Sequence, residues 1–196
     1  MLADMVARPL AIAVLVALAT PAFAHTDGVA NGFLGGLAHP LQGLDHVAAM
    51  VAVGLWGAFL GPPAVYLLPI VFPLVMAAGG VLGILGLAVP GVEAGIAVSA
   101  VILGSMVALA APAPLGLAVG LVGAFAVFHG YAHGAELAPG ADALAYSAGF
   151  VVATGTLHLL GIGFGLLARW PAGRYAVRAV GVAIALAGVV FLGRLI

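Results

Sequence analysis

The 196-residue chain contains no cysteine and no lysine, and only 6% of its residues are charged. Without cysteine it can form neither disulfides nor thiolate–metal bonds, so a metal site would need nitrogen and oxygen ligands, with at most a methionine sulfur. Five scattered arginines and a net charge of −1 leave no basic surface for nucleic acid. An ordinary soluble domain is about 25% charged, so this scarcity of charge indicates a protein that lies in a lipid bilayer.

Apolar residues make up 65% of the chain and fall into long segments separated by short breaks rich in proline and glycine. The breaks are too short to hold a soluble domain. The sequence therefore predicts an all-α integral membrane bundle of six transmembrane helices, at about 41–60, 64–88, 92–111, 114–134, 142–168 and 172–195.

The first residues, "MLADMVARPLAIAVLVALATPAFAH", predict a secretory signal peptide over 1–24. Arg8 is followed by an apolar run too short for a comfortable span, and then by the small-residue pattern that ends at Ala24. Cleavage there would make His25 the start of the mature membrane domain, 25–196, and an uncleaved first anchor is the alternative. Arginines cluster in the fifth break, which the positive-inside rule places in the cytoplasm. Counting back five spans puts the mature N-terminus outside, as signal-peptide cleavage also requires.

The stretch "HPLQGLDH" places His39, Asp45 and His46 in the first apolar segment. Pro40 suits the first turn of a helix. If the helix extends back to His39, the two histidines lie two turns apart on nearly one face, with Asp45 beside them. An aspartate near the centre of a span costs about 2.5–3.5 kcal/mol on insertion scales, so such residues usually face a cavity, a partner or a pathway.

A second polar motif, "FHGYAHGAE", places His129, His133 and Glu136 on one side of the fourth segment. The predicted topology brings both motifs to the extracytoplasmic end of the bundle. Neutral imidazoles and carboxylates suit a divalent nickel, cobalt or zinc ion, so the motifs form one metal site if their helices touch. His129 has an alternative role as a structural hydrogen-bonding residue between helices.

Three isolated polar residues admit simpler explanations. His158 either bonds a neighbouring carbonyl group or lies deeper along a transport path. Glu93, near the start of the third segment, is explained by the helix dipole or by membership of the extracytoplasmic site. Asp142 is expected to cap the fifth helix.

Glycines four residues apart predict close helix packing at Gly79/Gly83, Gly116/Gly120 and Gly161/Gly165.

The mature chain resembles the HupE/UreJ family of hydrogenase- and urease-accessory membrane proteins. The resemblance rests on both motifs, the signal peptide and the six spans with short loops. The resemblance implies a nickel permease of the bacterial inner membrane, with cobalt as a variation, that supplies metalloenzyme maturation and is neither an enzyme nor the holder of a prosthetic group. It assigns to the ion the six residues of the two motifs, and the family tends to carry an acidic residue near the position of Glu93.

The energy source is bounded by what the sequence lacks. No G-x-x-x-x-G-K-[ST] loop is present, so the chain is not itself a nucleotide-driven pump. The alternative from another class is a membrane-embedded zinc hydrolase, in which the same residues activate a water against a lipid amide or ester. A scaffold that docks a maturation factor is disfavoured, because the loops are too short to present a docking surface.

Overall fold

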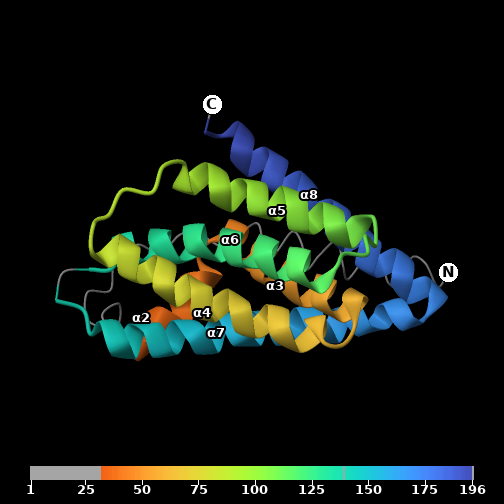
Figure 1. Cartoon of the computed structure of the whole chain (residues 1–196), viewed down its shortest axis with the longest axis horizontal. Coiled ribbons are helices and arrows are strands. Elements are labelled where there is room, and N and C mark those ends of the chain that lie inside the picture. The colour runs from red at the N-terminus through yellow and green to blue at the C-terminus, as the bar shows by residue number, and fades with distance from the viewer. Residues whose placement is uncertain (1–31, 139, 196) are drawn as a thin grey trace.

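The computed structural model describes residues 32–138 and 140–195, and every regular element among them is a helix (Figure 1). A short helix, α2 (Phe33–Ala38), and a 3-10 turn, η1 (His39–Leu41), come first, and a second 3-10 turn, η2 (Leu166–Arg169), precedes the last helix. Six long helices occupy the six predicted segments: α3 (Leu44–Leu60), α4 (Ala64–Ile84), α5 (Val92–Ala108), α6 (Leu115–Ala135), α7 (Ala143–Gly165) and α8 (Pro171–Gly193). The predicted signal peptide and His25 lie outside the described residues.

Not all six long helices meet the requirements for crossing a bilayer. Four of them, α4, α6, α8 and α7 extended by η2, are long and apolar enough. A fifth candidate is the bent pair Phe33–Leu41 and α3, whose axes differ by 85°. Helix α5 is apolar but has 17 residues, fewer than the roughly 20 that a span needs. The described residues thus form an all-helical membrane protein with four or five candidate spans, and the prediction of six is confirmed only to that extent.

The bend before α3 corrects the expectation that one helix carries both histidines of the first motif. His39 lies in η1, whereas His46 lies in the first turn of α3. Between them Gly43 is extended, with φ −100° and ψ 109°, so the chain leaves the helical path there and a new helix begins at Leu44. A glycine gives up the helical conformation at little cost. The two histidines therefore do not share one helical stripe.

Helix α3 lies at the centre of the bundle, where it packs against α4, α5, α7 and α8. Its Met50, Leu55 and Trp56 are completely buried. The outer helices instead expose large apolar side chains, such as Leu74 on α4 and Leu159 on α7, which are about two thirds exposed. An apolar outer surface of this kind suits lipid hydrocarbon. Asp45 and His46 of the first motif are therefore carried by a helix that the other helices shield from lipid.

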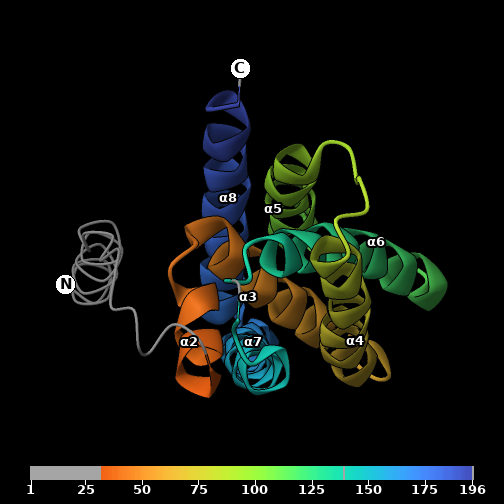
Figure 2. The same ribbon diagram turned by 90° about the vertical axis from the view of Figure 1, so that its left-hand side faces the viewer.

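Two of the three predicted glycine pairs lie where helix backbones touch. A Cβ atom at Gly79 or Gly83 would overlap backbone atoms of α6, and one at Gly161 would overlap the backbone of α3. The prediction is wrong for Gly116/Gly120, which face open space on α6. Figure 2 shows a third close pair, α5 beside α8, whose contact is also lined by glycines. Small residues allow this approach because they remove the side chains that would separate the helices.

The contacts fix the direction of each helix. Helices α3 and α7 are parallel, since Gly54 meets the backbone around Gly161 while Ala58 meets Gly165 further along both helices. Contacts of α4 with α6 advance in the same sense, and those of α5 with α8 run in opposite senses. The end of α5 lies beside the end of α3, where the Trp56 indole donates to the Ala111 carbonyl oxygen. The long helices therefore alternate in direction along the chain.

This alternation separates charges of opposite sign. All four acidic residues of the described chain lie at one end, at the starts of α3, α5 and α7 and the end of α6: Asp45, Glu93, Asp142 and Glu136. The opposite end carries Arg169, Arg174 and Arg178 around the junction of α7 and α8. Arg178 there donates through Nε to the carbonyl oxygen of Ala108, which ends α5. The bundle thus has an acidic end, where Arg194 after α8 is the one arginine of the described chain, and a basic end with the other three.

Candidate metal site

The first motif begins α3 with a carboxylate bonded to a histidine. Asp45 Oδ1 accepts from His46 Nδ1 at 2.8 Å and from the His46 backbone N–H at 2.8 Å. Because a carboxylate accepts, Nδ1 carries the proton and Nε2 of the neutral ring keeps a lone pair. That Nε2 is buried and has no partner within the described chain. A histidine held by a carboxylate through one nitrogen, with the other free, is the arrangement typical of metal-binding imidazoles.

His129 on α6 is oriented in the same way by a serine of α5. Ser99 Oγ donates its only proton to the Ile96 carbonyl oxygen at 2.6 Å, so at 2.9 Å it must accept from His129 Nε2. The neutral His129 ring then has its lone pair on Nδ1, which is buried and unpartnered in the described structure. The structural role that the sequence left open for His129 therefore exists, and it leaves one nitrogen available as a ligand.

His133, one turn further along α6, joins the two motifs. Its ring centroid lies 4.4 Å from that of His46 and 4.8 Å from that of His39, and the His46 centroid lies 4.8 Å from that of His129. His133 is 8% exposed, and neither of its ring nitrogens has a partner among the described residues. Phe150 of α7 packs against it, with centroids 4.2 Å apart.

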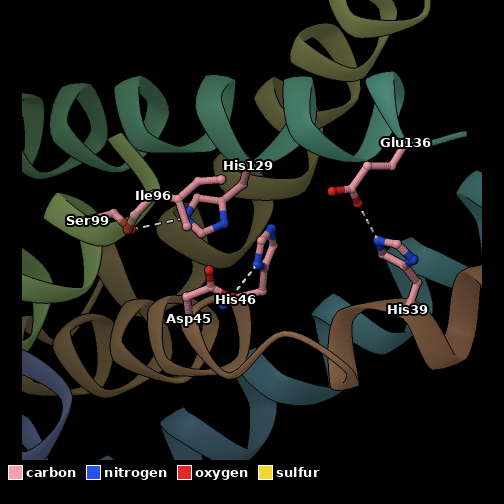
Figure 3. A network of polar contacts seen from close by, with 7 residues as sticks. All are labelled: His39, Asp45, His46, Ile96, Ser99, His129 and Glu136. Carbon is pink, nitrogen blue, oxygen red and sulfur yellow. Dashed lines mark hydrogen bonds and ion pairs between the residues drawn. The ribbon is translucent and has the colours of Figure 1, made fainter. Parts of the chain in front are cut away.

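His39 and Glu136 close the site on its outer side. Nε2 of His39 donates to Oε2 of Glu136 at 3.2 Å, and this hydrogen bond lowers the pKa of the Glu136 carboxyl below its usual value. Ligand atoms of His39, His133 and Glu136 lie within 4.8 Å of one another. Figure 3 shows His129 of α6 facing Asp45 and His46 of α3, and Glu136 of α6 facing His39 to one side of them. The bend at Gly43 allows His39 to face Glu136 while His46 faces His129.

Five of these six side chains border a cavity of about 250 Å³ at the acidic end of the bundle, and His129 lies behind it, outside the lining. Four elements contribute to its wall: η1 and the turn after it, α3, the first turn of α5 and the end of α6. Its lining includes His39, Asp45, His46, His133 and Glu136 from the two motifs, together with Gln42 and Glu93. Glu93 lies in the first turn of α5, so its position satisfies both explanations that the sequence allowed, a helix N-terminus and a place at the site.

The remaining polar residues lie elsewhere. Asp142 accepts from the backbone N–H groups of Leu144 and Ala145, so the predicted cap is confirmed. His158 does not line the cavity, and its Nδ1 donates to the Met50 carbonyl oxygen at 2.8 Å, the contact that the first of its two predicted roles requires. Ser99 and Gln42 were missed by sequence reasoning. Gln42 lies inside the first motif and could have been found there, whereas an isolated serine in an apolar helix gives no such signal.

A bundle of apolar helices that encloses imidazoles and carboxylates defines an integral membrane protein with a candidate divalent-metal site. The family model described as "HupE / UreJ protein" matches residues 12–191. A relative named "Protein HupE", from Rhizobium leguminosarum bv. viciae, is 49% identical over 180 residues, which cover 91% of this chain and 94% of the relative. No solved structure matches the chain.

The chain therefore belongs to the HupE/UreJ family, and the resemblance noted from the two motifs is confirmed. Membership of this family of accessory proteins agrees with the prediction that the chain is not an enzyme. Neither comparison points to the hydrolase alternative.

Proposed function

We propose that this protein is a permease that carries nickel ions, with cobalt as the second candidate, across the bacterial inner membrane for the maturation of hydrogenase or urease. The observation that carries the proposal is the convergence of both polar motifs on one cavity at the acidic end of an apolar bundle. Family membership supports the same role. The transported ion is the substrate of the site rather than a resident cofactor.

The donor set suits a borderline divalent ion. The proposed ligands and their supporting groups are His39, Asp45, His46, His129, His133 and Glu136, with Glu93 as an additional carboxylate. Imidazole nitrogen and carboxylate oxygen match nickel, cobalt and zinc better than they match soft or strictly oxygen-seeking ions. The unpartnered nitrogens of His46, His129 and His133 offer lone pairs without first breaking a hydrogen bond of the described structure. Asp45 acts on the ion mainly through His46, which it orients.

The charge distribution favours entry of cations at the cavity. By the positive-inside rule, the end with Arg169, Arg174 and Arg178 is cytoplasmic. The cavity and the mature N-terminus then lie on the extracytoplasmic side. Acidic residues gathered at one end raise the local concentration of cations there. The proposed direction of transport is therefore inward, from the cavity toward the arginine-bearing end.

The membrane potential supplies enough energy for this direction. A divalent cation that moves inward gains about 4.6 kcal/mol per 100 mV, twice the value for a single charge. That energy supports accumulation by about three decades. Exchange of the metal for protons on the histidines is a second route to coupling, because metal binding and proton binding compete for the same ring nitrogens.

Uptake of radiolabelled nickel into proteoliposomes with an imposed inside-negative potential tests the proposal. We expect uptake by the wild-type protein, competition by cobalt, and loss of uptake in Glu136→Gln. The Glu136 side chain is 58% exposed, so this change should leave the fold intact. Liposomes without protein give the background. Wild-type protein that reaches the membrane and takes up nickel no faster than empty liposomes would refute the proposed function.

A further inference from the structure

His158 of α7 has a free ring nitrogen deep in the bundle. Its Nδ1 lies 2.8 Å from the carbonyl oxygen of Met50, and a carbonyl only accepts, so the proton of the neutral ring is on Nδ1. Nε2 therefore carries the lone pair. His158 is 1% exposed, and its Nε2 has no partner in the described structure. This is the same arrangement that orients His46 and His129, with a backbone carbonyl as the acceptor.

Thr154 places a second unused polar group beside it. Thr154 precedes His158 by four residues, so both side chains lie on one face of α7. Thr154 is completely buried, and its hydroxyl has no partner among the described residues. Thr156 on the same helix is different, because it is exposed and its hydroxyl donates to the Val152 carbonyl oxygen. Buried polar groups are nearly always paired in folded proteins, so two groups without a protein partner on one helix face are available to a ligand.

The pair lies near His129 of the second motif. The ring of Phe72 on α4 lies next to both His129 and His158, with ring-centroid separations of 5.5 and 5.3 Å. Met50, which holds His158, is one helical turn beyond His46 on α3, in the direction of the basic end. Phe72 is therefore a neighbour shared by His129 and His158, and His158 is held at a level closer to the basic end than His46 is.

We propose that Nε2 of His158 and the hydroxyl of Thr154 form a second, transient site for the transported divalent ion, separated from the entry cavity by Phe72. The inference rests on the proposed function and adds a step to it. A site with one imidazole nitrogen and one hydroxyl binds more weakly than the cavity, and a weak inner site lets the ion leave. Passage between the two sites requires the Phe72 ring to move aside.

His158→Asn separates this role from a structural one. The asparagine amide nitrogen takes the place of Nδ1 and can still donate to the Met50 carbonyl oxygen, but nothing replaces Nε2. If His158 only stabilises the fold, this variant should take up nickel at the wild-type rate. The transient site predicts that uptake falls by at least about tenfold, the loss caused by removing even an outer partner of a metal ligand. Calorimetric nickel titration of the purified variant should show the cavity affinity unchanged.

Thr154→Val gives an independent test with a matched control. Valine has the shape of threonine and removes a hydroxyl that makes no hydrogen bond in the described structure, so the thermal unfolding midpoint should not fall. Nickel uptake should fall nevertheless, whereas Thr156→Val should transport as the wild type does. Because Thr154→Val keeps its fold, it decides the matter even where His158→Asn fails to reach the membrane.

The outcomes distinguish the two levels of the proposal. If the wild-type protein takes up nickel and either His158→Asn or Thr154→Val takes it up at the same rate, the two-ligand inner site is wrong. The proposed function is unaffected by that result. A wild-type protein that neither binds nor takes up nickel overturns both. Loss of uptake in both variants, with cavity affinity and unfolding midpoints retained, supports the inner site.

Discussion

Replacing Asp45 by asparagine should weaken nickel binding by about 10- to 100-fold, the range found when an outer partner of a metal-bound histidine is removed. Asp45 Oδ1 accepts two hydrogen bonds from His46, from the ring Nδ1 and from the backbone, each at 2.8 Å. Asparagine keeps the size and one acceptor oxygen, but it removes the charge that strengthens the bond to the ring and makes Nε2 a better donor to the ion. At about 1.4 kcal/mol per tenfold, the expected loss is about 1.4–2.8 kcal/mol.

Calorimetric titration of detergent-purified protein with nickel measures this loss, and uptake into proteoliposomes should decline with it. Stability should not suffer, because an amide is cheaper than a carboxylate to bury in an apolar bundle. Asp142→Asn is the matched control, since Asp142 lies at the same end of the bundle as a helix cap, where asparagine serves as well. Wild-type nickel affinity in Asp45→Asn, at equal yield of folded protein, would refute the orienting role of this carboxylate.

Four further predictions concern other parts of the molecule. Ser99→Ala should lower nickel affinity by about tenfold, because His129 loses the hydroxyl that accepts from its Nε2. Ser105→Ala should leave the affinity unchanged, because the Ser105 hydroxyl bonds only a carbonyl of its own helix. Gly130→Ala should lower the thermal unfolding midpoint, since the added Cβ overlaps the backbone of α4. Gly120→Ala, in open space on the same helix, should raise stability by about 0.5–1 kcal/mol. A single cysteine introduced at Ala172, in a chain that has none, should resist impermeant maleimide in intact cells, and labelling from outside would reverse the proposed orientation.

The long helices were predictable from the sequence because apolar runs and proline–glycine breaks are local features. Each of the six predicted segments contains one long helix, with ends shifted by up to a few residues. The break at Gly43 was not predictable. Pro40 suits the start of a helix, and a glycine within an apolar run reads as a small residue on a helix face, so nothing local shows that the chain becomes extended there. The bend allows His39 to contact Glu136, which is distant in the sequence.

The site was predictable in its members and only partly in its roles. The spacing of His129, His133 and Glu136 marks them as one group because helical periodicity is local. The role of Ser99 depends on which residue of a neighbouring helix faces it, and Ser99 and Ser105 look alike in the sequence. Only the packing of α5 against α6 tells them apart. Likewise, whether a glycine pair touches another helix depends on its neighbours, so Gly116/Gly120 could not be separated from the pairs that do.

The glycine contacts join helices of the bundle into two rigid pairs, α4 with α6 and α3 with α7. Where α4 meets α6, a Cβ atom at Gly79, Gly83, Gly130 or Gly134 would overlap the backbone of the partner helix. A contact of backbone on backbone has no side chains that can change rotamer and so absorb sliding. Helices α3 and α7 are joined in the same manner at Gly54 and Gly161. Each pair should therefore move as one rigid unit. His133 belongs to the α4–α6 pair and His158 to the α3–α7 pair. A shift of one pair against the other would change the separation of the two histidines without bending any helix.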